Sequence, residues 1–191
     1  MIKFFDLEKQ DKSLHKSILR DIKKLFKRGD FILGKEVLKF EKNFAKFCES
    51  NYAISCANGT DALTIALKSL NLEKNSEVII PAMTYCSTAF SVINANLKPV
   101  LVDTEPFKPT IDASKIKKKI TSKTKVIMPV HLYGSAANLN AIKKIIKKNS
   151  IFLIDDCAQA HGTIDDSDTT YNKKIGSTAD ISCFSLYPGK N

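Results

Sequence analysis

Three short polar segments of this sequence, each following a run of apolar residues, carry side chains that could do chemistry. The first contains Gly59 and Thr60, the second contains Asp155 and Asp156, and the third ends in a Pro-Gly turn and Lys190. Free N–H groups at a glycine-containing helix start can hold a phosphate. A strand-end carboxylate can face a cationic ligand, and a lysine shielded from water becomes a nucleophile that forms Schiff bases.

Each segment also has a second explanation. A glycine followed by a capping residue, here Thr60 or Asp61, ends many strand-to-helix connections for structural reasons only. A strand-end aspartate can hold Mg²⁺ or cap a helix, and most lysines are solvated. The long glycine-rich fingerprints of dinucleotide and nucleoside-triphosphate sites are absent from the sequence, which argues against NAD and ATP and weakens the Mg²⁺ interpretation. Because side chains alternate along a strand, only one of Asp155 and Asp156 can point into a site, and Gln159 would lie on the side of Asp156.

The combination is more specific than its parts. An anion site, an acid partner for a pyridine nitrogen and an amine that carries an aldehyde are the groups that pyridoxal phosphate requires. The cysteines form no Cys-x-x-Cys pair and have no nearby His at metal-ligand spacing. We therefore expect a pyridoxal phosphate site and no metal.

A sheet must position these segments. After residue 50, short β-branched runs alternate with stretches of helical periodicity, which predicts an α/β fold with a mainly parallel sheet covered on both faces, in three layers. In such sheets ligands bind beyond the carboxyl ends of the strands, where all three polar segments fall. The predicted strands are residues 53–56, 77–80, 99–103, 126–131, 151–155 and 181–187. The predicted helices between them are residues 61–70, 87–95, 113–120 and 139–148.

The first fifty residues follow a different pattern. Apolar residues recur at helical spacing over residues 14–26 and 36–48, and the turn-like stretch RGDFILGK separates the two runs. We predict a helical N-terminal segment over residues 1–50 and a cofactor-binding large domain over residues 51–191.

The charge of the chain raises the question of a nucleic-acid partner. The formal net charge is +10, and of the 30 cationic residues only Arg20 and Arg28 are arginines. Planar, bidentate recognition of phosphate and guanine favours arginine. We attribute the charge to lysine-rich, solvated helix faces and expect no nucleic-acid partner, so a basic nucleic-acid-binding protein is the minor alternative. The composition, 43% hydrophobic and 26% charged, argues against intrinsic disorder.

Cysteine usage and hydropathy bear on location. The five cysteines are an odd number without the spacing of a disulfide framework. The N-terminal residues lack the apolar core of a signal peptide, and no run approaches the length of a membrane span. We expect a cytoplasmic protein with no membrane partner.

Seven stretches, in order along the chain, resemble the DegT/DnrJ/EryC1/StrS family of pyridoxal-phosphate-dependent sugar aminotransferases. They are GDFILGKEVLKFEKNFAKF, SCANGTDALTIAL, EVIIPAMTYCSTAFSVI, PVLVD, VIMPVHLYG, IDDCAQAHG and FSLYPGKN. They run through nearly all 191 residues, and seven ordered matches are more specific than any single motif. The resemblance implies the large domain of the aspartate-aminotransferase-like fold, known as fold type I.

The resemblance implies two catalytic residues. Lys190 matches the lysine that forms the Schiff base with the cofactor and then moves a proton between the substrate Cα and the cofactor. Asp156 matches the carboxylate that keeps the pyridinium nitrogen protonated, which makes the ring an electron sink. His131 and Tyr133 lie close by in such proteins, and we expect them to be structural, with His131 orienting its neighbours.

The resemblance also implies further cofactor contacts. Gln159 matches the residue beside the phenolic oxygen, Tyr85 matches the aromatic that stacks on the ring, and Ser185 matches a phosphate contact. The backbone of the first helical turn supplies the other phosphate contacts. The full set of implied cofactor-binding residues is Gly59, Thr60, Asp61, Tyr85, Asp156, Gln159, Ser185 and Lys190.

The implied reaction is a ping-pong transfer of an amino group from L-glutamate to a nucleotide-linked keto-sugar, as used in polysaccharide and lipopolysaccharide biosynthesis. Family members that carry His in place of Lys190 act as sugar dehydratases, so the lysine favours the aminotransferase. Similar proteins work as homodimers in which the partner chain completes each site. The positive charge of this chain would attract a diphosphate substrate.

The sequence also departs from the family pattern. Cys157 stands where the family commonly has Ala, and residues 163–178 predict a surface-loop insertion. Similar proteins continue beyond the position of Asn191 into the last strands of the large domain and a smaller C-terminal domain. We therefore expect a domain truncated before its last strand and inactive by itself. It is either a fragment of a longer aminotransferase or an inactive truncated remnant.

Overall fold

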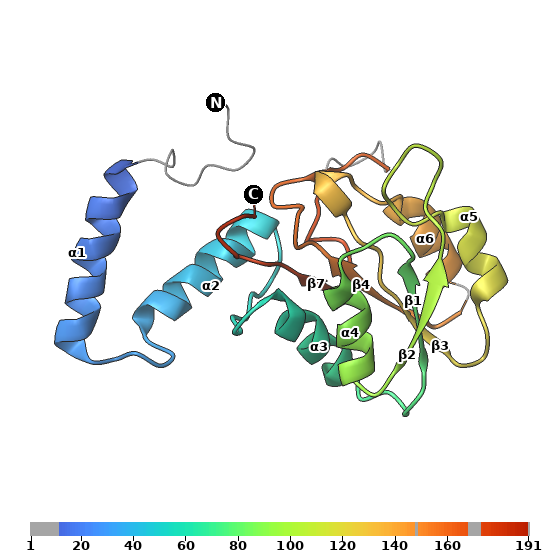
Figure 1. Ribbon diagram of the computed structural model, residues 1–191, viewed down its shortest axis with the longest axis horizontal. Helices are drawn as coiled ribbons and strands as arrows, with labels where there is room; N and C mark the ends of the chain where they lie inside the picture. The colour runs from blue at the N-terminus through green and yellow to red at the C-terminus, as the bar shows by residue number, and fades with distance from the viewer. Residues whose placement is uncertain (1–11, 148, 168–172, 191) are drawn as a thin grey trace.

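The computed structural model describes residues 12–147, 149–167 and 173–190. At its centre lies a sheet of five parallel strands in the order β2-β1-β3-β4-β7 (Figure 1). These strands are β1 Glu77–Pro81, β2 Lys98–Val102, β3 Thr124–Ile127, β4 Phe152–Asp156 and β7 Ile181–Cys183. The predicted parallel α/β sheet is confirmed.

Helices cover both faces of this sheet, as predicted. On one face, α3 Gly59–Ser69 and α4 Cys86–Asn94 pack against Val78 and Ile80 of β1. On the other face, α5 Ala113–Ile116 and α6 Leu139–Ile146 pack against Ile79. Since alternate residues of the central strand β1 enter two different apolar clusters, the continuous apolar run in the sequence is explained by burial on both sides.

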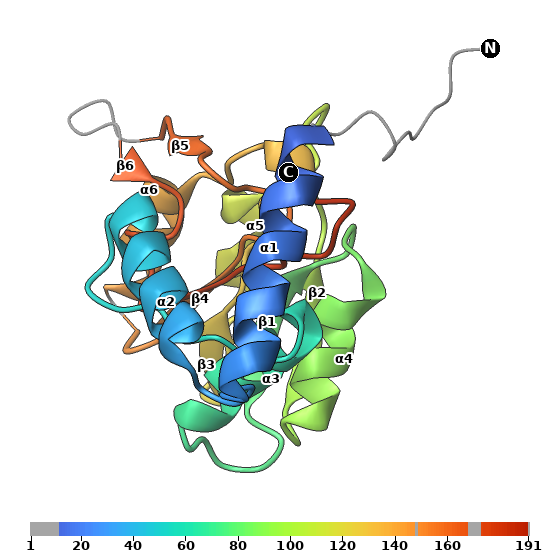
Figure 2. The ribbon, with the colours of Figure 1, turned by 90° about the vertical axis from the view of Figure 1, so that its left-hand side faces the viewer.

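The two predicted N-terminal helices are present as α1 Lys12–Arg28 and α2 Lys35–Cys48. They relate differently to the sheet. The end of α2 packs against the body, where the Phe44 ring lies 5.1 Å from that of Phe184 and Cys48 is buried. Figure 1 shows α1 standing apart from the sheet, and in Figure 2, where that side faces the viewer, α1 lies in front of the sheet. Residues 1–11 lie outside the described residues, and the domain boundary at residue 50 stays a prediction.

One predicted strand is wrong. Residues 53–56 belong to no ladder of the described residues, and the side chain of Ile54 is 88% exposed. The segment is tied instead to α2, because the Ser55 N–H donates to a carboxylate oxygen of Glu41 at 2.7 Å. A β-branched run forms a strand only where a neighbouring strand pairs with it, which the local sequence does not reveal.

Other predicted elements differ at their ends. The strand predicted over residues 126–131 ends at Ile127 and is followed by the 3₁₀ turn η3 Leu132–Gly134, and the strand predicted to residue 187 ends at Cys183. The helix predicted over residues 113–120 is α5 followed by the 3₁₀ helix η2 Lys117–Lys119. Residue 148, the predicted end of α6, lies outside the described residues.

Two short strands lie within the segment predicted to be a surface-loop insertion. Strands β5 Ile164–Asp165 and β6 Lys173–Lys174 pair as a separate antiparallel sheet, and residues 168–172 between them lie outside the described residues. All five cysteines are free. Among the described helices, none has both the length and the apolar character needed to span a membrane.

Candidate active site

The predicted site residues lie on segments that meet at the carboxyl edge of the sheet. Contacts link these segments across long stretches of sequence. Position 59 touches Ser185, the Thr60 hydroxyl donates to the Ser87 hydroxyl at 2.9 Å, and Asp156 binds a side chain of α4. The α3 and α4 N-termini therefore lie beside the ends of β4 and β7.

Asp156 is the most constrained of these residues. Its side chain is only 5% exposed at the end of β4, where Oδ2 accepts a hydrogen bond from Thr88 Oγ1 at 2.8 Å and Oδ1 accepts one from the Ala158 N–H at 3.1 Å. Burial raises the pKa of the Asp156 carboxyl, and the two hydrogen bonds and the charge of Lys190 act in the opposite direction. A nearly buried carboxylate is thus held in one orientation and retains lone pairs for a ligand.

Asp155 points to the other face of the strand, as predicted from side-chain alternation. Its Oδ2 lies 3.5 Å from His131 Nε2, and both side chains are fully buried. His131 Nδ1 accepts a hydrogen bond from the Ala137 N–H, so the neutral ring carries its hydrogen on Nε2, facing Asp155. The pair joins β4 to the loop after β3, which fits the structural role predicted for His131.

Cys157 completes a cluster with this pair. Its Sγ, His131 and Asp155 offer atoms that all lie within 4.8 Å of one another. Burial raises the pKa of the Cys157 thiol well above its ordinary value, so the sulfur stays protonated beside these two side chains. The absence of a metal stays a prediction.

The start of α3 offers backbone donors. The cap is Asn58 rather than the predicted Thr60 or Asp61, because Asn58 Oδ1 accepts from the Asp61 N–H at 2.9 Å. The N–H of Asp61 is thereby occupied, which leaves the N–H groups of Gly59 and Thr60 as the donors of the first turn that a ligand can use. An anion at this helix end would also be stabilised by the helix dipole.

Ser185 follows β7 and sits directly against this helix start. A Cβ placed on Gly59 would lie 2.9 Å from Ser185 Cβ and 3.3 Å from Ser185 Oγ. Glycine is required here because of close approach. The consequence is that the Ser185 hydroxyl lies beside the first turn of α3, as the predicted phosphate contact requires.

Tyr85 and Gln159 flank the same edge. Tyr85 is the N-cap residue of α4, and its side chain is 68% exposed, so its ring is accessible to a ligand. Gln159 follows Asp156 in a turn rather than in the helix start that was predicted, and its Oε1 accepts from the Tyr133 N–H at 2.8 Å. This bond fixes Gln159 against η3.

Lys190 lies past β7 in a turn closed by a hydrogen bond from its N–H to the Tyr187 carbonyl at 2.8 Å. It is half-buried, and its charge reaches both Asp156 and His161. Asn191 lies outside the described residues. The structure thus brings Lys190 to the edge that carries Asp156, and the roles of all the site residues stay predictions.

Sequence reasoning placed three further polar residues at this edge, Asn58, Ser87 and Thr88, but gave them no role. Thr88 is fully buried and binds Asp156 directly. One signal could have found it, because Thr88 and Ser91 are spaced three residues apart on the face of α4 that is otherwise apolar.

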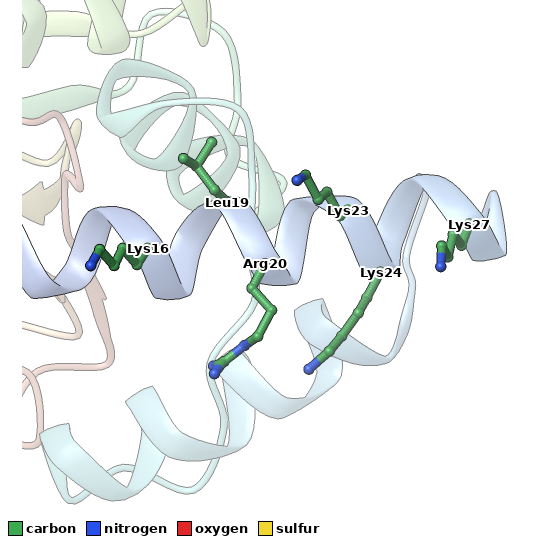
Figure 3. Close-up of a pocket in the computed structure, with 6 residues that line it drawn as sticks. All are labelled: Lys16, Leu19, Arg20, Lys23, Lys24 and Lys27. Atoms are coloured by element: carbon green, nitrogen blue, oxygen red, sulfur yellow. The ribbon is translucent and has the colours of Figure 1, made fainter.

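A surface hollow lies elsewhere, along α1 (Figure 3). Its lining residues are Lys16, Leu19, Arg20, Lys23, Lys24 and Lys27. All six belong to one helix, and none follows a strand of the sheet. This hollow is a cationic surface feature and is separate from the candidate site.

Comparison with known proteins places these residues in a family. The DegT/DnrJ/EryC1/StrS aminotransferase family matches residues 12–191. A dTDP-3-amino-3,6-dideoxy-alpha-D-galactopyranose transaminase of Aneurinibacillus thermoaerophilus is 42% identical over 187 residues, which cover 97% of this chain and 50% of that protein.

Solved structures agree with this match. S. venezuelae DesV, in complex with a ketimine intermediate, superposes with a TM-score of 0.92 at 33% identity, over 99% of this chain and 50% of that one. NtdA from Bacillus subtilis, with bound cofactor PMP, gives a TM-score of 0.91 at 31% identity, over 99% of this chain and 42% of that one. The chain therefore spans about half the length of the relatives it matches.

The strand order, the convergence of the three polar segments at one sheet edge and the match over residues 12–191 lead to one conclusion. This chain belongs to the DegT/DnrJ/EryC1/StrS aminotransferase family and has the fold of its pyridoxal-phosphate-dependent members over about half their length.

Proposed function

We propose that this chain is the cofactor-binding part of a pyridoxal-phosphate-dependent nucleotide-sugar aminotransferase. The observation that carries the proposal is the buried Asp156 carboxylate, which is held by two hydrogen bonds at the same sheet edge as Lys190 and the α3 N-terminus. Solved relatives of the same fold include one with bound PMP, which supports the choice of cofactor.

The described residues fit this cofactor. The N–H groups of Gly59 and Thr60 and the Ser185 hydroxyl would hold its phosphate, because an anion is favoured at a helix start with free donors. The exposed ring of Tyr85 would stack on the cofactor ring. The predicted contact through the Asp61 N–H competes with the Asn58 cap.

When bound, pyridoxal phosphate supplies an electron sink that stabilises negative charge at the substrate Cα. Asp156 would hold a proton on the pyridine nitrogen, because a carboxylate of fixed orientation stabilises a positive charge beside it. Lys190 Nζ would supply the amine that carries the cofactor aldehyde, and that amine would accept and return a proton at the substrate Cα. Gln159, fixed by its bond to the Tyr133 N–H, would lie beside the phenolic oxygen of the bound cofactor.

The proposed substrates are L-glutamate and a nucleotide-linked keto-sugar, as needed in the cytoplasm for polysaccharide or lipopolysaccharide biosynthesis. The name of the Aneurinibacillus relative, a transaminase acting on a dTDP-linked amino sugar, supports this substrate class. The net charge of +10 would attract a nucleoside diphosphate.

We also propose that turnover needs more polypeptide than these residues. The relatives are about twice as long, and we expect the functional protein to be a homodimer in which the partner subunit completes each site. Residues 1–191 would then bind the cofactor without catalysing the complete reaction.

Covalent attachment of the cofactor tests the proposal. We expect the chain mixed with pyridoxal phosphate to turn yellow and, after borohydride reduction, to carry the cofactor mass on the peptide that contains Lys190. The Lys190→Ala variant should lose both signals, because it removes the amine that carries the aldehyde.

Lys125→Ala is the matched control, since Lys125 is half-buried at the opposite end of the sheet, on β3. It should keep both the absorption band and the label. Survival of the band in Lys190→Ala, or a label spread over many lysines, would overturn the proposal.

A further inference from the structure

Two threonines connect the buried Asp156 carboxylate to the loop after β1. Thr88 Oγ1, in the first turn of α4, donates to Asp156 Oδ2 at 2.8 Å, and Thr84 Oγ1 lies 2.8 Å from Thr88 Oγ1. Thr88 is fully buried, whereas Thr84 is half-buried. Three oxygen atoms thus form a continuous chain from the protein interior toward the surface.

The direction of this chain follows from counting hydrogens. An ionised carboxylate can only accept, and a hydroxyl has one hydrogen to donate. Since Thr88 gives its hydrogen to Asp156, the Thr84 hydroxyl must donate to Thr88. The ionised carboxylate thus fixes the order Thr84 to Thr88 to Asp156, and a proton on Asp156 Oδ2 would reverse it, because that oxygen would then donate to Thr88.

The Thr88 hydroxyl has given up its usual local partner. A helical threonine commonly bonds the carbonyl four residues back, as Thr64 of the neighbouring helix α3 does with the Thr60 carbonyl at 2.9 Å. Thr88 bonds instead to a side chain 68 positions away in sequence. The bond serves Asp156 and does not stabilise α4 locally.

Several charged or titratable groups face Asp156, and their effects differ. The charge of Lys190 favours the ionised form of Asp156, whereas burial, the largest effect, disfavours it. Asp155 points to the other face of β4, where it lies against His131. The thiols of Cys157 and Cys183 lie close and stay protonated, because burial raises their pKa values. The hydrogen bond from Thr88 is the largest of the effects that oppose burial, followed by the bond from the Ala158 N–H.

We propose that Thr84 and Thr88 form a two-hydroxyl relay that orients the Asp156 carboxylate and holds it in its ionised form. Thr88 is a positioning residue that acts through Asp156, and Thr84 strengthens Thr88 as a donor by bonding to its oxygen. The inference rests on the proposed function, since an ionised Asp156 is what a pyridine nitrogen would require.

The test is a pH titration of Asp156 in the cofactor-free chain, followed by ¹³C NMR of labelled aspartate carboxyls and assigned with Asp156→Asn. Thr88→Val keeps the shape of the side chain and removes the donor, so the pKa of Asp156 should rise by about one unit or more. Thr88→Ser restores the hydroxyl and should bring the pKa back to within about 0.3 units of the original. Thr84→Val should give a smaller rise, because Thr88 can still donate.

Thr64→Val is the matched control, because its hydroxyl makes only the local bond within α3. It should leave the Asp156 titration unchanged. The relay proposal is wrong if the pKa of Asp156 does not rise in Thr88→Val, or if it rises as much in Thr88→Ser as in Thr88→Val. If Thr88→Val does not fold, Thr84→Val decides, since it alters only a half-buried side chain and an absent shift there refutes the relay.

The two proposals fail in different ways. If the relay proposal is wrong, Thr88→Val will leave the pKa of Asp156 unchanged, and the cofactor will still attach at Lys190. Failure of the proposed function would remove the cofactor label and leave the hydroxyl effect on the Asp156 titration in place.

Discussion

At position 59, backbone and side chain approach each other too closely for any residue but glycine. The nearest neighbour of a Cβ on Gly59 would be Ser185 Cβ at 2.9 Å, which is an atom fixed to the backbone and unable to swing away. The helix start and the segment after β7 are therefore pressed together at the place where we propose that a phosphate binds. Close packing at this contact, and not a left-handed backbone, is the reason for the glycine.

We predict that Gly59→Ala destabilises the chain by about 1–3 kcal/mol, because the added methyl overpacks the contact with Ser185. Urea unfolding measures the loss. The double variant Gly59→Ala with Ser185→Gly removes the colliding Cβ and should recover most of it, and Ser185→Gly alone is the control. A double variant no more stable than Gly59→Ala would show that the collision is not the cause.

The residues of the site differ in how far the sequence predicts them. Alternation along a strand was enough to separate Asp155 from Asp156, because that rule is local. The partner of Asp156 was not predicted, since Thr88 is 68 positions away and only the packing of α4 against the sheet brings the two together. Likewise the cap at Asn58 depends on the path by which the chain enters α3.

At the scale of elements, Glu77 ties three strands together. It begins β1 at an irregularity in the pairing with β3, and its carboxylate accepts bonds from Thr121 Oγ1 at 2.6 Å, Lys98 Nζ at 3.2 Å and Thr124 Oγ1 at 3.3 Å. The bond from Thr121 is the largest cause that lowers the pKa of the Glu77 carboxyl. The Lys98 side chain is 62% exposed, so the ion pair itself contributes little.

We predict that Glu77→Gln lowers the free energy of unfolding by about 1–3 kcal/mol at pH 7. Because the pKa of Glu77 is lower in the folded chain, its stabilising effect is complete above the unfolded pKa of about 4.3 and is lost as the pH falls through the folded value. Urea unfolding at pH 7 and near pH 3 should therefore show that the original chain and Glu77→Gln differ less in free energy of unfolding at the lower pH. Glu73→Gln, at an exposed position, should behave as the original at both pH values, and a pH-independent difference would contradict the charge argument.

Helices were predicted better than strands, for a physical reason. A helix satisfies its hydrogen bonds within its own segment, so the apolar period in α1, α2, α3 and α4 located all four to within about two residues. A strand needs a neighbour, and residues 53–56 have the composition of a strand but no ladder partner in the described structure. The regular strand β3 ends at Ile127, but residues 128–131 still bond to the neighbouring strands, with a parallel bridge between Val130 and Asp156, before the chain turns into η3, where Tyr133 has a φ of 56°.

At the scale of the molecule, the apolar surface is unevenly distributed. The sheet is covered on both faces, whereas α1 presents large apolar side chains to solvent. Leu14, Ile18 and Ile22, spaced four residues apart, are 53%, 51% and 41% exposed and form what we call the α1 stripe. The other sides of this helix carry the lysines shown in Figure 3. Opposite forces thus act on one helix, since the stripe favours association and the charges oppose it.

We predict that the chain self-associates through the α1 stripe, and that association strengthens as NaCl is raised from 0.05 to about 0.5 M because salt screens the repulsion between lysine-rich helices. Sedimentation velocity over a concentration series measures this.

Replacing Ile18 and Ile22 together by Lys should weaken association at least about tenfold, because each burial is worth about 1.5–3 kcal/mol when complete. The matched control replaces Ile54 and Ile164, which are 88% and 41% exposed on other segments, by Lys and should associate like the original. If the control dissociates as readily, net charge governs association, and if salt weakens association, ionic contacts and not the stripe hold the copies together.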